Sequence, residues 1–129
     1  MTLPRVLDAC QQVLFDPTDT RNPECEQLLK VAMLVCQNIE RSCQGSSEPA
    51  YHNRLHFADA MVSLTTLMRL QANLTGVSSP AWMAALLLTV SAHDFSHPGG
   101  ANAHPHQIEQ HSLMALQPML EGHLDPRWF

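Results

Sequence analysis

The run of residues 81–90 most restricts what this chain can fold into. It reads AWMAALLLTV, and Thr89 is its only polar residue. Pro80 comes just before the run and HPGG follows at 97–100, so a helix that starts near the proline must end before the glycines. A helix that is apolar on nearly all faces must be covered by other elements. We therefore expect a central helix over about 81–94, more buried than any other part of the chain.

The other segments of the chain also carry helix signals, and strand signals are nearly absent. A capping residue followed by proline marks three starts, at Thr2, Asn22 and Ser79. Apolar residues recur at the 3.6-residue helical period in the segments after residues 23 and 50. These patterns predict an all-α domain over residues 1–129. The five expected helices cover about 2–15, 23–43, 50–74, 81–94 and 106–120, with Gly122 as the stop of the last one.

Charge and hydropathy exclude two classes of partner. The formal net charge is −5, Lys30 is the only lysine, and the six arginines are scattered, so no basic stripe for nucleic acid is expected. Residues 71–93 carry no formal charge, but they begin with the polar sequence QANLTGVSSP. The apolar part that remains is about a dozen residues, short of the ~20 that cross a bilayer. We therefore expect neither nucleic acid nor a membrane as partner.

The cysteines and the N-terminal sequence indicate a cytoplasmic protein. Cys10, Cys25, Cys36 and Cys43 form no CxxC pair. Cys25 and Cys36 share one predicted helix, where their separation of about 16 Å is too long for a disulfide. Reduced thiols are therefore expected. The first residues, MTLPRVLDAC, lack the apolar segment of a signal peptide.

Histidines gather near the predicted helix ends. His52 and His56 are four residues apart, which places them on one face of a helix. His93 and Asp94 end the apolar helix, and His97 follows. Each has an ordinary alternative, since an HxxxH pair alone is weak evidence and a histidine can simply favour a helix C-terminus. Together they favour a metal site, because imidazole and carboxylate suit zinc, while carboxylate and water suit magnesium or manganese.

Three segments that contain these residues resemble the class I cyclic-nucleotide phosphodiesterases. YHNRLHFADA at 51–60 resembles the family pattern YHNxxHAxDV, and HDFSHPGGAN at 93–102 resembles HDxxHPGxxN. IEQHSLMALQPML at 108–120 is similar to the family helix LENHHLAVAFKLL. The segments occur in the family's order and span about residues 51–120. The wider group is the all-helical HD-domain metal phosphohydrolases, so the resemblance implies an HD-domain helical bundle.

The resemblance implies a role for each matching residue. His56, His93 and Asp94 match the ligands of a zinc ion, and Asp94 also matches the bridge to a second ion, magnesium or manganese. His52 matches the general acid that protonates the leaving 3′-oxygen, and Glu109 matches the carboxylate that orients it. The positions that support these residues are matched by Asn53, Asp59, His97 and Asn102.

The implied activity is hydrolysis of a 3′,5′-cyclic nucleotide in signal transduction. Metal-bound hydroxide would attack phosphorus, while the two ions neutralise the phosphodiester charge. Two alternatives stay open. One is a catalytically inactive helical module of this fold that binds metal or another protein, and the other is an HD-domain hydrolase of a different nucleotide.

The sequence departs from the family pattern at two places. Only eleven residues separate His97 from Glu109, fewer than in the family. The family's last metal ligand and its base pocket match positions beyond residue 129, and the final LDPRWF reads as the start of another helix. We therefore expect a chain that stops short of the complete domain, exposes apolar surface and forms a homo-oligomer.

Overall fold

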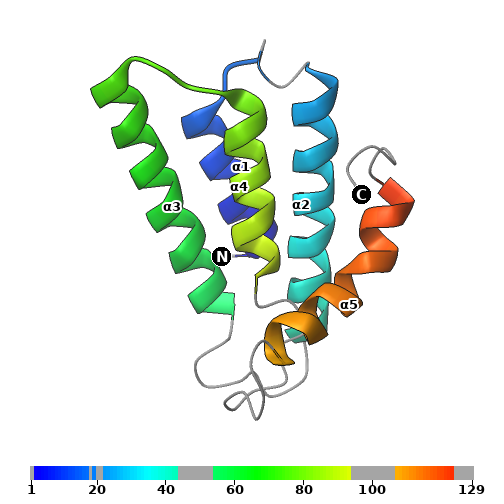
Figure 1. The fold of residues 1–129 in the computed structure, drawn as a ribbon. Helices are drawn as coiled ribbons and strands as arrows, with labels where there is room; N and C mark the ends of the chain where they lie inside the picture. Colours follow the sequence, from blue (N-terminus) through cyan, green and yellow to red (C-terminus); the bar gives the residue numbers. More distant parts are fainter. Residues whose placement is uncertain (1, 18, 20–21, 44–53, 94–106, 124–129) are drawn as a thin grey trace.

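The computed structural model describes residues 2–17, 19, 22–43, 54–93 and 107–123, and within them the fold is all-α. No strand occurs in these ranges. The five helices are α1 (Leu3–Leu14), α2 (Pro23–Cys43), α3 (Arg54–Thr75), α4 (Pro80–Ala92) and α5 (Gln107–His123) (Figure 1). The predicted all-α class and the predicted order of helices are confirmed. No helix among the described residues is long and apolar enough to cross a membrane.

Local capping interactions set the boundaries of α2, α3 and α4. The Asn22 side-chain oxygen accepts hydrogen bonds from the backbone N–H groups of Glu24 (3.0 Å) and Cys25 (3.5 Å). The Ser79 hydroxyl accepts one from Trp82 N–H at 3.4 Å. After α3, Gly76 has φ of 69° and donates its N–H to the Ala72 carbonyl, a conformation that favours glycine. The caps predicted at Asn22 and Ser79 are confirmed.

The ends of α1 and α5 differ from the prediction. Thr2 has the backbone conformation of a cap, but its side chain makes no capping hydrogen bond within the described part of the chain. Helix α5 continues to His123, past the stop expected at Gly122, and Pro118 lies inside it.

The buried carboxylate of Glu40 caps the N-terminus of α1. Glu40, near the end of α2, accepts a hydrogen bond from the Leu3 backbone N–H at 3.0 Å. Its other oxygen lies 2.7 Å from Nη1 of Arg54, the first residue of α3. A negative charge at a helix N-terminus is favourable, and a buried charge needs a partner. Glu40 therefore links the start of α1, the end of α2 and the start of α3.

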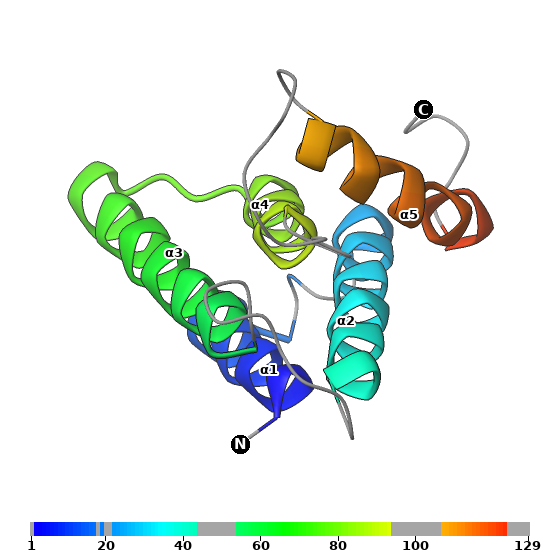
Figure 2. The ribbon, with the colours of Figure 1, turned by 90° about the horizontal axis from the view of Figure 1, so that it is seen from below.

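The first four helices form a bundle. Helices α1 and α3 run in one direction and α2 and α4 in the other (Figure 1). Seen along the bundle, α1 packs beside α2 and α3, and α4 also packs beside α2 and α3, while α2 and α3 lie on a diagonal (Figure 2). Helix α5 packs outside this bundle against α2. The start of α3 and the end of α4 consequently lie at the same end of the bundle.

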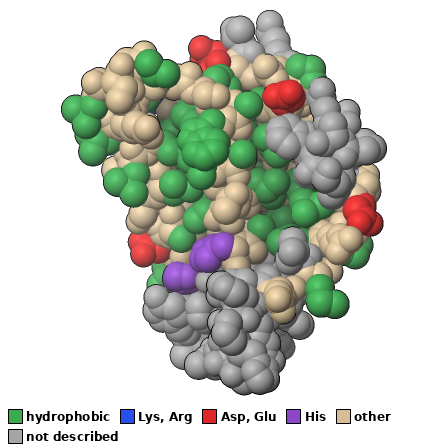
Figure 3. Space-filling model, viewed as in Figure 1, with side chains coloured by type: hydrophobic (Ala, Val, Ile, Leu, Met, Phe, Trp, Pro, Cys, Tyr) green, Lys and Arg blue, Asp and Glu red, His purple; other side chains and the backbone are tan. Residues whose placement is uncertain are grey.

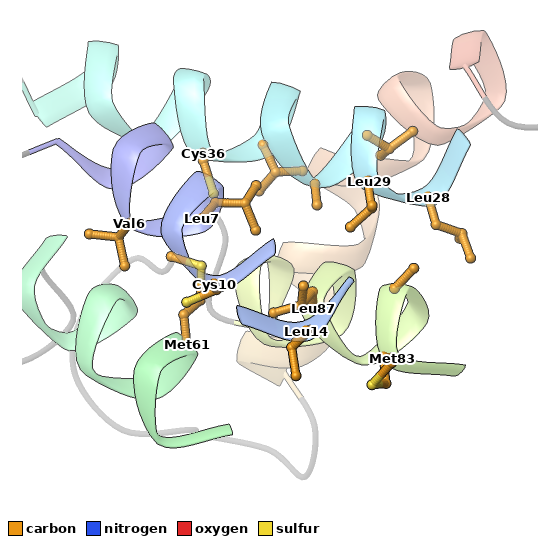
Figure 4. Packing of buried hydrophobic residues seen from close by; sticks show 14 of the residues in the cluster. Val6, Leu7, Cys10, Leu14, Leu28, Leu29, Cys36, Met61, Met83 and Leu87 are labelled. Atoms are coloured by element: carbon orange, nitrogen blue, oxygen red, sulfur yellow. The ribbon is translucent and has the colours of Figure 1, made fainter. Parts of the chain in front are cut away.

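Helix α2 is the centre of the fold. Side chains from α1 to α4 converge in the core (Figure 4). Among the described residues, α2 supplies the largest share of that core: Cys25, Leu28, Leu29, Val31, Ala32, Val35, Cys36 and Ile39. It contacts each of the other four helices, whereas α4 contacts mainly α2 and α3.

The prediction that the helix over 81–92 is the most buried is therefore wrong. Its inner face is covered, but Trp82 is 61% exposed. Apolar side chains remain visible over this part of the surface (Figure 3). The physical reason is that α4 packs mainly against α2 and α3, so side chains on its outer face stay exposed.

The described cysteines are reduced, as predicted. Cys10, Cys25 and Cys36 are free thiols buried in the core. Burial raises the pKa of Cys36 to about 11, and burial also raises the pKa of Cys25. A raised pKa keeps a thiol protonated and unreactive at neutral pH. The side chain of Cys43 lies outside the described residues.

Candidate functional site

Two of the predicted metal ligands meet where the start of α3 faces the end of α4. His56 lies in the first turn of α3, and His93 directly follows α4. Their ring centroids are 5.9 Å apart, and the ring planes are inclined by 56°. In Figure 3 the histidine side chains lie next to one another at the surface. The bundle thus brings together two imidazoles that are distant in the sequence.

Phe57 packs against both histidine rings. Its ring centroid lies 6.2 Å from that of His56 and 6.0 Å from that of His93, and both contacts are edge-on. Phe57 is buried, so it belongs to the core as well as to the site. Aromatic pairs at these separations are favourable and help to set ring positions. Phe57 was not among the predicted residues, although an aromatic residue next to His56 was a usable signal.

A backbone hydrogen bond sets the tautomer of His93. Its Nδ1 atom lies 2.7 Å from the carbonyl oxygen of Val90. A carbonyl can only accept, so Nδ1 must carry the proton and the neutral ring has its lone pair on Nε2. Histidines that bind metal ions commonly donate their other ring N–H in this way.

The spacing of the two rings fits a shared divalent ion. With Zn–N bonds of about 2.0–2.1 Å, two imidazoles on one ion have centroids roughly 5 Å apart. The observed separation of 5.9 Å is somewhat larger than this. Within the described ranges no group of three or more His, Cys, Asp or Glu side chains is close enough to hold a metal. The described part of the site is therefore a pair of histidines.

The other predicted site residues are distributed as follows. Asp59 is exposed on α3 and lines a groove between α3 and α1. Glu109 lies on α5, but its side chain is outside the described residues. Five further residues lie outside the described ranges, and their roles remain predictions: His52, Asn53, Asp94, His97 and Asn102.

Comparison with known proteins gave no match. No protein-family model, no curated protein and no solved structure matches the chain. The features of the described residues that bear on function are the all-α bundle and the histidine pair at one end of it.

Proposed function

We propose that this protein is a metal-dependent phosphohydrolase of the HD-domain type that hydrolyses a 3′,5′-cyclic nucleotide. The observation that carries the proposal is the meeting of His56 and His93. Each histidine lies in a segment that resembles a phosphodiesterase motif; His56 lies on α3, and His93 directly follows α4. A shared metal ion gives a chemical reason for placing two imidazoles together at the end of a bundle.

In this proposal, His56, His93 and Asp94 hold a zinc ion, and Asp94 also holds a magnesium or manganese ion. When bound, such ions neutralise the charge of a phosphodiester and lower the pKa of a water molecule. His52 donates a proton to the leaving 3′-oxygen, and Glu109 orients His52. The roles of Asp94, His52 and Glu109 are taken from the sequence resemblance.

The described residues prepare the two histidines for this task. The Val90 carbonyl holds His93 in the tautomer with its lone pair on Nε2. Phe57 touches both rings from the core side, which restrains the separation between them. A Phe57→Leu change would keep an apolar side chain but lose both ring contacts, so metal binding should weaken while the fold persists.

Metal binding is the first test. The chain is loaded with Zn²⁺ or Mn²⁺, and the bound metal is measured by mass spectrometry. We expect His93→Ala to lower metal affinity by about 10-fold or more, since losing even a residue that only hydrogen-bonds to a metal ligand lowers affinity by about that factor. Glu121→Gln is the matched control, because Glu121 is exposed and accepts a hydrogen bond only from the neighbouring Gln117 in the described part of the chain. Unchanged metal content in His93→Ala would refute the site.

Hydrolysis is the second test. Cyclic AMP and cyclic GMP are incubated with the chain and Mn²⁺, and the 5′-monophosphates are measured. His52→Ala should remove most of the activity and leave bound metal in place, because His52 is assigned to proton donation. Turnover of another nucleotide alone would favour the generic HD-domain hydrolase. Bound metal without any hydrolysis would favour the inactive module.

We also propose that the protein forms a homo-oligomer. Several apolar side chains between the later turns of α3 and the start of α4 are more than half exposed: Leu67, Leu70, Leu74, Val77 and Trp82. Contiguous apolar patches of this kind usually mark association surfaces. Light scattering should show a dimer or larger assembly, and Trp82→Lys should weaken it. A monomer at micromolar concentration would contradict this part of the proposal.

A further inference from the structure

A groove of about 920 Å³ lies between α1 and α3, and neither His56 nor His93 is among the residues that line it. Most of its lining is apolar, with Val6 and Val13 from α1 and Leu55, Val62 and Leu70 from α3. All of these except Val6 are more than half exposed. The volume falls within the range of about 300–1,000 Å³ that is typical of small-molecule sites.

Thr65 is an unusual residue in the lining of this groove. It is only 6% exposed, and among the described residues nothing offers its hydroxyl a hydrogen-bond partner. By contrast, the hydroxyls of Thr66, Thr75 and Thr89 donate to the backbone carbonyl four residues earlier in the same helix, at 2.8–2.9 Å. A buried hydroxyl without a partner is costly, so Thr65 is poised for a partner that the described residues do not supply.

Polar groups gather at the Thr65 end of the groove. Arg69 and Asn73 follow Thr65 at four-residue spacing, and all three line the same cavity. Arg69 Nη1 lies 3.5 Å from the Val13 carbonyl, which places the guanidinium across the groove at the end of α1. A guanidinium has five N–H donors, so this single contact leaves most of them for a ligand.

The opposite part of the groove is suited to a hydrocarbon chain. From Thr65 back to Leu55, α3 rises by about 15 Å at 1.5 Å per residue, which is comparable with an extended medium-chain alkyl group. Val62 and Leu55 line this stretch on α3, and Val6 lines it on α1. Arg5 and Asp59 also line the groove, and their opposite charges offset one another.

We propose that the groove binds a medium-chain carboxylate amphiphile. The carboxylate accepts hydrogen bonds from Arg69, one helical turn from Thr65, and the alkyl chain lies along Val62 toward Leu55. Thr65 adds a hydrogen bond after its side chain rotates about χ1, since threonine in a helix has two accessible rotamers. The charge of Arg69 favours an anionic head, and polar donors inside an apolar groove favour a small molecule over a second copy of the chain. This site is independent of the proposed hydrolase function.

The test is a calorimetric titration of the full chain with dodecanoate, below the concentration at which it forms micelles. We expect saturable binding at one site per chain and much weaker binding of dodecyltrimethylammonium, which has the same tail and the opposite charge. Arg69→Gln should weaken dodecanoate binding by about 10-fold or more, because a charge-assisted hydrogen bond is lost. Thr65→Val should weaken it by a smaller factor. Thr89→Val is the matched control and should leave affinity unchanged, since Thr89 lies on α4, outside the groove lining, and its hydroxyl already donates to the Ala85 carbonyl.

Three results would overturn the proposal. The first is the absence of saturable dodecanoate binding, and the second is equal affinity for the anionic and cationic amphiphiles. The third is a dimer in which a second copy of the chain covers the groove. Val62→Glu would convert such a dimer to a monomer, and dodecanoate would not dissociate it. Circular dichroism of each variant checks that the bundle is intact.

Discussion

Replacing Thr65 with valine should stabilise this protein, although it removes a polar group from a helix. Valine has nearly the same shape as threonine and carries a methyl group in place of the hydroxyl. In the folded chain the Thr65 hydroxyl is buried, and no described residue is its hydrogen-bond partner. In the unfolded chain water satisfies the same hydroxyl. Threonine at this position therefore loses hydrogen bonds on folding, and valine does not.

The size of the effect follows from the cost of burying such a group. An unpartnered hydroxyl costs about 1–3 kcal/mol in protein mutational data. Helix propensity changes little, since threonine and valine have similar values. We therefore expect the free energy of unfolding to rise by about 1–2 kcal/mol. For a chain of 129 residues, each kcal/mol corresponds to a Tm increase of about 4 °C.

Urea unfolding followed by circular dichroism measures this change. Thr66→Val provides the comparison, because the exposed Thr66 hydroxyl donates to the Val62 carbonyl at 2.9 Å. That surface substitution should change stability by no more than about 0.5 kcal/mol. If Thr65→Val proves neutral or destabilising relative to Thr66→Val, then the Thr65 hydroxyl has a partner in solution and the reasoning fails.

Three further predictions concern buried residues of the core and the interactions of Glu40 that join three helices. Glu40→Ala should lower the free energy of unfolding by about 2–4 kcal/mol, measured by urea titration, because the Leu3 N–H and the Arg54 guanidinium both lose their buried partner. Leu87→Ala, at a fully buried position, should cost about 2–5 kcal/mol, whereas Leu74→Ala, at a side chain that is 78% exposed, should cost about 0.5 kcal/mol or less. The Cys36 thiol, with its pKa raised to about 11, should resist a thiol reagent at pH 8 until urea unfolds the chain; rapid labelling of the folded protein would contradict its burial.

The helices themselves could be predicted from the sequence. Asn22 and Ser79 cap their helices as the sequence indicated, and the apolar period of the second helix matches its buried face. These features depend on residues within a few positions of one another, so they can be predicted without the tertiary structure. The sequence also predicted that His56 and His93 lie close together, and their ring centroids are 5.9 Å apart.

Only the tertiary structure determined how these helices share the core. The apolar run of 81–90 indicated a central helix, yet α2 took that place because it lies against all four other helices. Thr2 read as the cap of α1, but Glu40 supplies the hydrogen bond from the far end of α2. In each case, burial or capping depends on which segment, distant in the sequence, packs against the helix. The local sequence pattern does not specify that segment.

The same limit applies to both sites. The contact of Phe57 with His56 and His93 requires the start of α3 to lie beside the end of α4. Thr65 is buried without a hydrogen-bond partner among the described residues, and it lines a groove because α1 and α3 pack side by side. A sequence specifies which side chains are apolar or polar, but burial and hydrogen-bond partners depend on pairs of residues that the folded chain brings together from distant positions.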